Sequence, residues 1–225
     1  MSPSGDRLGD MPAWQQLYED CTARDLAAFE TLVLSQQPAS TPWRPVTDYS
    51  FEARKAIEGR HPELIWQHLI DRDAAKVLDY GCGPDAHLVR LLQEYRWEHL
   101  SWTEVKIAGY EPQRRDNHPA PRAIWDLVIC REVFEHCTIR EIRRLVSVLC
   151  TLSAHLIYVT TRFAKAPTSL LSVDTSDELD PSHISMLNQN FLRVLFVLEG
   201  FKRRADLETK MDWQQKGRCL VYERV

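Results

Sequence analysis

The residues from Asp79 to Asp85 place an acid, two glycines and a helix start in the order that a nucleotide-type site needs. The apolar run that ends at Asp79 predicts a strand, and Gly81 and Gly83 predict a tight turn after it. Glycine lets the backbone turn sharply and approach a ligand closely, and the first N–H groups of a helix lack intrahelical partners. The pattern therefore predicts a ligand site at the carboxyl end of the first strand of an α/β sheet.

Two kinds of ligand fit such a turn, and the neighbouring acids favour one of them. Gly81, Gly83 and Ala86 spell G-x-G-x-x-A, which is a weak dinucleotide signature when it stands alone. A pyrophosphate on the helix start would meet the carboxylates of Asp79 and Asp85, which is unfavourable. S-adenosylmethionine (SAM) carries a sulfonium and an ammonium group and no phosphate, so the acids favour SAM.

This stretch resembles the first motif of the class I SAM-dependent methyltransferases, acid-x-Gly-x-Gly-x-Gly, with Asp85 in place of the third glycine. The resemblance continues to the end of the chain. It covers a second strand ending in an acid, a fourth strand running into a segment similar to "EVLEH", a fifth strand, and a tail typical of small-molecule methyltransferases. These segments are Ile107–Glu111, Trp125–Cys130 with Arg131–His136, His155–Thr161, and His183–Leu187.

The resemblance implies SAM as the cofactor and assigns residues to it. Asp79, Gly81 and Gly83 would hold the methionine portion, and the carboxylate of Glu111 would accept hydrogen bonds from the ribose hydroxyls. Arg131, just past the fourth strand, would line the cofactor pocket mainly through its backbone.

Two histidines are the candidate catalytic residues. The methyl group of SAM is already activated, so positioning supplies much of the rate, and a hydroxyl acceptor gains from a base that removes its proton. His136 and His183 both fall in loops at the carboxyl side of the sheet according to the resemblance. We therefore expect methyl transfer to a hydroxyl of a small molecule, of the sugar or secondary-metabolite class.

Glu132, Glu135 and His136 raise an alternative. On a helical turn they would share one face, and with His183 they would form a set that suits a divalent ion. This set resembles the metal site of RNA 3′-terminal 2′-O-methyltransferases, so metal-dependent RNA 2′-O-methylation is one alternative. The segment also occurs in methyltransferases that need no metal, and the leading interpretation includes none. A catalytically inactive, methyltransferase-like binding module is a further alternative, suggested by the missing third glycine.

The alternation of strand and helix patterns predicts an α/β fold. We expect a Rossmann-like class I methyltransferase sheet, mostly parallel with an antiparallel last strand. Arg204–Glu208 and Arg218–Glu223, at the end of the chain, should form two antiparallel strands. The interval from Glu111 to Asp126 holds three prolines and is too short for a crossover helix plus a strand, because a crossover alone takes about a dozen residues. The region between strands two and three should be shortened, leaving a third strand only around Arg122–Ile124.

The N-terminal part contains helical patterns over 13–34 and 51–70, separated by a proline-rich linker at 36–45. We therefore expect a helical cap over 1–72 and a SAM-binding core over 73–225, within one compact domain.

Composition narrows the class of protein. At 225 residues and 44% hydrophobic content, the chain can bury one sizeable core, and its formal net charge of −4 does not favour nucleic acid or membranes as partners. The six cysteines are scattered without a C-x-x-C pair, and there is no N-terminal targeting pattern or long apolar span. We expect a cytoplasmic enzyme with reduced thiols and a small-molecule partner; the oligomeric state is not predicted.

Overall fold

The computed structural model describes residues 55–56, 58–70, 75–99, 104–112, 120–163, 171–172, 183 and 185–225. All of them belong to one compact unit, Trp43–Val225. The predicted helix over 13–34 and the predicted linker lie outside the described residues. The division into a cap over 1–72 and a core over 73–225 therefore stays a prediction.

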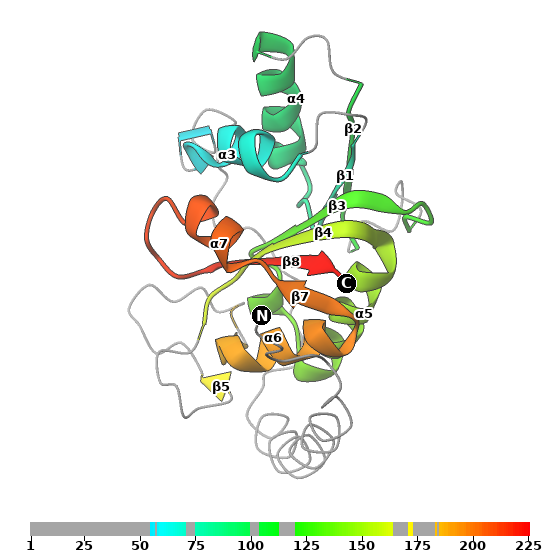
Figure 1. The fold of residues 1–225 in the computed structure, drawn as a ribbon, viewed down its shortest axis with the longest axis vertical. Coiled ribbons are helices and arrows are strands. Elements are labelled where there is room, and N and C mark those ends of the chain that lie inside the picture. The colour runs from blue at the N-terminus through cyan, green and yellow to red at the C-terminus, as the bar shows by residue number, and fades with distance from the viewer. Residues whose placement is uncertain are drawn as a thin grey trace, which may run out of the picture. The chain divides into compact units, whose positions relative to one another are not determined.

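A six-stranded sheet organises the described chain, with the strand order β2-β1-β3-β4-β8-β7 (Figure 1). β2, β1, β3 and β4 run parallel, whereas β8 runs antiparallel to both β4 and β7. The predicted α/β class, mostly parallel with an antiparallel end, is confirmed. The strands are β1 Lys76–Tyr80, β2 Lys106–Tyr110, β3 Trp125–Arg131, β4 Ser153–Thr160, β7 Phe201–Arg203 and β8 Cys219–Arg224.

The central strands are continuous apolar runs because both of their faces are covered. Val77 and Leu78 of β1 are at most 1% exposed, and β3 is buried throughout Leu127–Cys130. Strands buried on both faces lose the alternation of apolar and polar residues that half-exposed strands show. A separate two-stranded sheet pairs β5, Leu171–Ser172, with β6, Met186–Leu187.

Helices cover the two faces of the sheet. In Figure 1, α5 and α6 lie on one side of the sheet, and α3, α4 and α7 lie on the other. Within the described part of the chain, no helix combines the length and the apolar character needed to cross a membrane. The helices are α3 His61–His68, α4 His87–His99, α5 Ile139–Leu152, α6 Gln189–Leu198 and α7 Ala205–Met211.

The start of α5 is set by a capping box. The Thr138 hydroxyl accepts from the backbone N–H of Glu141, and the Glu141 carboxylate accepts from the backbone N–H of Thr138 at 2.7 Å. This reciprocal pair satisfies N–H groups that a helix start leaves without partners. It also fixes where the chain leaves the short 3-10 turn Phe134–His136, which carries one of the predicted catalytic histidines.

The connection between β2 and β3 is short, as predicted. Residues 120–124 form no strand, so the third strand expected around Arg122–Ile124 is absent there. In the described sheet β2 is therefore an edge strand, beside β1 only.

One predicted strand is wrong. Arg204–Glu208 was expected to pair with the last strand, but β7 ends at Arg203 and the chain turns into α7. Leu207 and Met211 are both buried and four residues apart, so they lie on one face of this helix.

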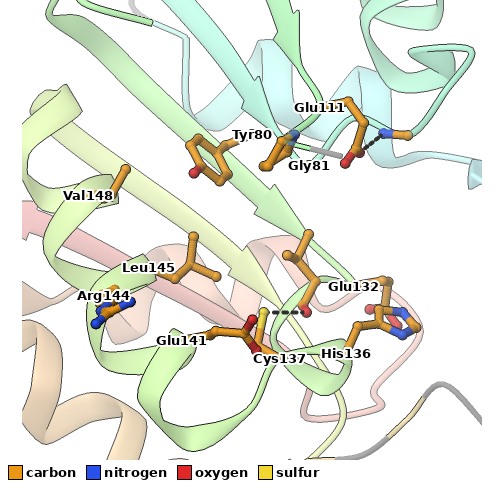
Figure 2. A pocket seen from close by; sticks show the side chains of 13 residues that line it. Tyr80, Gly81, Glu111, Glu132, His136, Cys137, Glu141, Arg144, Leu145 and Val148 are labelled. Carbon is orange, nitrogen blue, oxygen red and sulfur yellow. Dashed lines mark hydrogen bonds between the residues drawn. The ribbon is translucent and has the colours of Figure 1, made fainter. Parts of the chain in front are cut away.

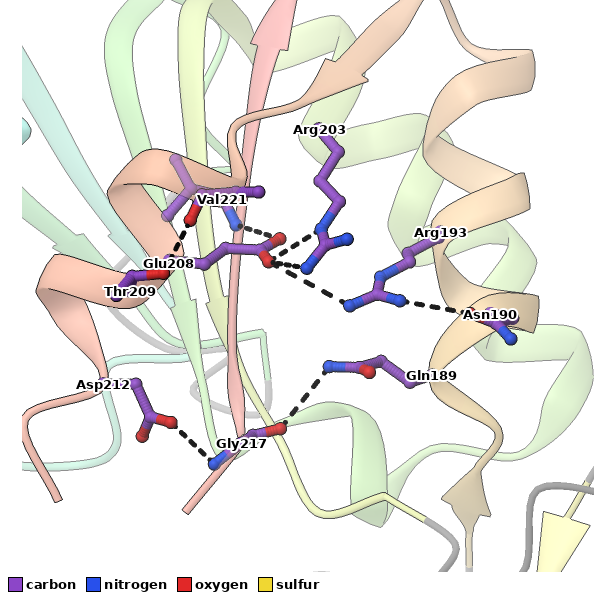
Figure 3. A network of polar contacts seen from close by, with 10 residues as sticks. Gln189, Asn190, Arg193, Arg203, Glu208, Thr209, Asp212, Gly217 and Val221 are labelled. Carbon is purple, nitrogen blue, oxygen red and sulfur yellow. Dashed lines mark hydrogen bonds and ion pairs between the residues drawn. The ribbon is translucent and has the colours of Figure 1, made fainter. Parts of the chain in front are cut away.

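A buried carboxylate fastens α7 to the strands beside it (Figure 3). Glu208, which is 6% exposed, accepts from Arg203 Nε at 2.7 Å and from the backbone N–H of Val221 at 3.3 Å. Arg193 of α6 approaches the same carboxylate at 4.0 Å. Glu208 therefore joins α6, α7, β7 and β8.

Replacing Glu208 with alanine should lower the free energy of unfolding by about 1–3 kcal/mol, because a buried backbone donor and an arginine lose their acceptor. Urea unfolding followed by circular dichroism measures this change. Asp206→Ala is the matched control, since its exposed pair with Arg204 on the same helix contributes little. Equal effects of the two substitutions would contradict the fastening role of Glu208.

Candidate active site

The turn after β1 has no room for a side chain at Gly81. Gly81 has a φ of 79° and Gly83 a φ of 70°, which are left-handed conformations that favour glycine. A Cβ at Gly81 would lie only 2.5 Å from Cγ2 of Val133, so the loop after β3 packs directly on the turn. The backbone N–H of Gly81 donates to the carbonyl of Tyr110 at 2.7 Å, which ties the turn to the end of β2.

Glu111 follows β2 and reaches across to the same turn. Its Oε2 accepts from the backbone N–H of Gly83 at 2.9 Å (Figure 2). The parallel register that aligns Asp79 with Gly109 brings the ends of β1 and β2 level, and this places the acid beside the turn.

A cavity of about 370 Å³ opens at this turn. Figure 2 shows Tyr80, Gly81 and Glu111 on one side of it, with side chains of the 3-10 turn and of α5 opposite. This volume lies within the range of small-ligand pockets, about 300–1,000 Å³. The lining residues are Tyr80, Gly81, Gly83, Glu111, Pro112, Glu132, Val133, His136, Cys137, Glu141, Arg144, Leu145 and Val148.

Asp79 lies beneath the turn and is only 3% exposed. Burial raises the pKa of its carboxyl to about 7; the positive charge of Arg131 opposes this rise, and the negative charges of Glu58 and Glu111 add to it. Four charged side chains therefore interact at the carboxyl ends of β1, β2 and β3.

Arg131, which was expected just past this strand, is the last residue of β3, and it is not among the residues that line the cavity. Its Nη1 donates to Glu58 Oε2 at 2.5 Å, and its Nη2 lies 3.4 Å from Nδ1 of His61. Burial alone would raise the pKa of Glu58, but the charge of Arg131 and hydrogen bonds from His61 and Arg131 hold that pKa at about 2. Glu58 and His61 were not predicted as site residues, because they belong to no motif and lie at the start of an ordinary helical segment.

His136 and His183 come together from distant parts of the chain. Their ring centroids are 4.8 Å apart, and one potential ligand atom from each ring lies within 4.8 Å of a carboxylate oxygen of Glu135. Glu135 is fully buried, and its Oε2 accepts from the hydroxyl of Thr161 at 2.7 Å. The backbone N–H of Ser185 donates to the carbonyl of Glu135, which holds the segment of His183 against the 3-10 turn.

The sequence suggested that Glu132 shares a helical face with Glu135 and His136. In the structure it does not. It lies before the 3-10 turn with a φ of 50°, and the compact set of possible ligands in the described chain is Glu135, His136 and His183. Burial and the negative charge of Glu132 raise the pKa of Glu135 well above its usual value. Burial would also raise the pKa of Glu132, but its contacts with Glu135 and the charge of Arg131 lower it. The pair can therefore share one proton.

The sequence profile of a family described as a methyltransferase domain matches residues 51–204, which is more than half of the chain. None of the curated proteins is a significant sequence match.

Three solved structures illustrate what the fold is similar to. A magnesium protoporphyrin IX methyltransferase from Synechocystis PCC 6803 with bound SAM is 13% identical, with a TM-score of 0.43 over 80% of this chain and 87% of that one. An O-methyltransferase family protein from Burkholderia thailandensis is 13% identical, with a TM-score of 0.47 over 99% and 73%. Human N-acetylserotonin methyltransferase is 11% identical, with a TM-score of 0.46 over 77% and 54%. Nothing about the substrate follows from likenesses this distant.

The buried carboxyl of Asp79 should make stability depend on pH. An unfolded aspartate ionises near pH 4, whereas Asp79 in the folded protein ionises near pH 7, so unfolding between these values releases a proton. The folded state favours the neutral carboxyl of Asp79, so the stability that this residue allows is fully present at low pH and is lost as the pH rises to about 7. Asp79→Asn should match the wild type near pH 4 and exceed it at pH 8, by at most about 4 kcal/mol.

Urea unfolding at several pH values measures this difference. Asp85→Asn in the same turn is the control, because its carboxylate is exposed and should leave the pH profile unchanged. A constant difference between Asp79→Asn and the wild type across this range would contradict the assignment.

Proposed function

Because the chain belongs to the methyltransferase family whose profile it matches, and is therefore a SAM-dependent methyltransferase, we propose that it methylates a hydroxyl group of a small molecule. Sugars and secondary metabolites are the proposed acceptor class. The size of the cavity and the net charge of −4 support a small acceptor over nucleic acid.

The glycine turn fits the cofactor. Gly81 and Gly83 leave the backbone bare at the cavity, and Asp79 lies beneath the turn where a cationic ligand would offset its burial. In this proposal they hold the methionine portion, and Glu111 exchanges its contact with Gly83 for the ribose hydroxyls. When bound, SAM supplies an activated methyl group on its sulfonium.

The observation that carries the acceptor assignment is the pair of imidazoles at the cavity. His136 lines the cavity, and the ring of His183 lies against the ring of His136. The segment around Glu135 holds both residues. A neutral imidazole can take the proton of an acceptor hydroxyl as its oxygen forms the new bond to carbon. Two adjacent rings let one accept the proton while the other orients the hydroxyl.

Replacing both histidines with alanine should lower turnover by at least about 100-fold, the usual contribution of a general base. S-adenosylhomocysteine (SAH) affinity should stay within a few-fold of wild type, because neither residue is assigned to the cofactor. Turnover is measured on the acceptor identified by screening, and SAH binding by calorimetry. His155→Ala, which removes an exposed histidine from β4, is the control. Undiminished turnover in the double variant would refute the assignment.

One observation favours a second candidate, metal-assisted 2′-O-methylation of RNA. Glu135, His136 and His183 each offer a ligand atom within 4.8 Å of the others, which suits a divalent transition metal. In this candidate Glu135, His136 and His183 would hold the ion, the histidines would be ligands and not bases, and the ion would supply Lewis-acid polarisation of the acceptor oxygen.

Chelation separates the two candidates. If the second is right, protein treated with EDTA loses methyl transfer to the 3′-terminal ribose of RNA, and Mn²⁺ restores it while the His183→Ala variant stays inactive. Full activity in EDTA, or no activity on RNA with Mn²⁺ present, removes this candidate.

A further inference from the structure

A buried charged cluster lies beside the glycine turn but does not line the cavity. It consists of Arg131 at the end of β3, with Glu58 and His61 from the segment that leads into α3. The side chains of Arg131 and Glu58 are 13% and 12% exposed. Nothing in the acceptor proposal uses these residues.

The guanidinium of Arg131 has an unused donor. Nη1 binds Glu58 and Nη2 lies beside His61, but Nε is buried and has no hydrogen-bond partner in the described part of the chain. Buried donors almost always have an acceptor, so an N–H left over beside a ligand site indicates a missing anionic or polar group. Nε and Nη2 share one edge of the guanidinium, which is the edge that a carboxylate can accept from in a bidentate manner.

The position of this edge relates it to the cofactor. Arg131 directly precedes Glu132 and Val133, which line the cavity, and Val133 packs against Gly81. Asp79 interacts electrostatically with both Arg131 and Glu58. Arg131 is thus next in sequence to the cavity wall and interacts with the acid beneath the turn, where the methionine portion of the cofactor is assigned.

The charges of the cluster are complementary to an amino acid. Asp79 interacts electrostatically with two further carboxyls, Glu58 and Glu111, and with the guanidinium of Arg131. A ligand that adds one carboxylate and two positive charges, as the methionine end of SAM does, would give Arg131 an acceptor and offset the excess of acids.

We propose that the Arg131 side chain binds the α-carboxylate of SAM, and that Glu58 is the positioning residue that holds its guanidinium. This assigns Arg131 a side-chain role beyond the backbone role expected from the sequence. The proposal concerns the cofactor alone, so it holds or fails independently of the hydroxyl acceptor and of any metal.

Three ligands test it by calorimetry on the full chain: SAM, decarboxylated SAM, and 5′-methylthioadenosine, which lacks the amino-acid end. The wild type should bind SAM at least about 10-fold more tightly than decarboxylated SAM, as expected for a charged hydrogen-bonded pair. Arg131→Met should abolish this discrimination and leave the affinity for 5′-methylthioadenosine within about 3-fold. Glu58→Gln should reduce the discrimination in the same direction.

Arg60→Met is the matched control. Arg60 belongs to the same turn as Glu58, but its side chain is 60% exposed and pairs with Glu63, so all three affinities should be unchanged. If Arg131→Met weakens SAM and 5′-methylthioadenosine equally, the cluster only fastens α3 to the sheet and the proposal is wrong. It is also wrong if the variant still discriminates against decarboxylated SAM as strongly as the wild type.

Discussion

The contact between Gly81 and Val133 is the constraint on which the site depends. No Cβ fits at Gly81, so the turn after β1 and the loop after β3 pack backbone against side chain. This contact fixes the chain directly before the 3-10 turn that carries Glu135 and His136. Val133 also lies two residues past Arg131, the last residue of β3. Both ends of the proposed ligand site are therefore positioned by one close approach between neighbouring parallel strands.

Buried negative charge is the second feature that unites the site. Asp79, Glu58, Glu111, Glu132 and Glu135 gather near the carboxyl ends of the strands, and the cations that interact with them include Arg131 and Arg218. Such an arrangement costs stability in the absence of a ligand, because burial penalises each charged form. A cationic cofactor recovers part of that cost on binding. The acids beside the turn favoured SAM over a dinucleotide for the same electrostatic reason.

Local patterns predicted the parts of this fold that depend on local physics. The apolar runs, the glycine turn, the acid at Glu111 and the short β2–β3 connection all follow from adjacent residues. The helix at 205–211 was mistaken for a strand because burial of Leu207 and Met211 depends on partners elsewhere. Glu58 and His61 could not be predicted, since only the tertiary fold brings them to Arg131. His183 was placed by resemblance, and its contact with His136 required the structure.

The short β2–β3 connection changes what surrounds the ligand site. Residues 120–124 add no strand beside β2, and α5 supplies Arg144, Leu145 and Val148 to the cavity wall opposite Tyr80. Val148 is 39% exposed, which is unusual for an apolar side chain at a pocket. Leu145 and Val148 thus give the cavity an apolar patch along α5, beside the charged side chains of Glu141 and Arg144. A ligand that spans it needs a charged end at Asp79 and a planar or apolar part along the helix, and adenosine joined to an amino acid has both.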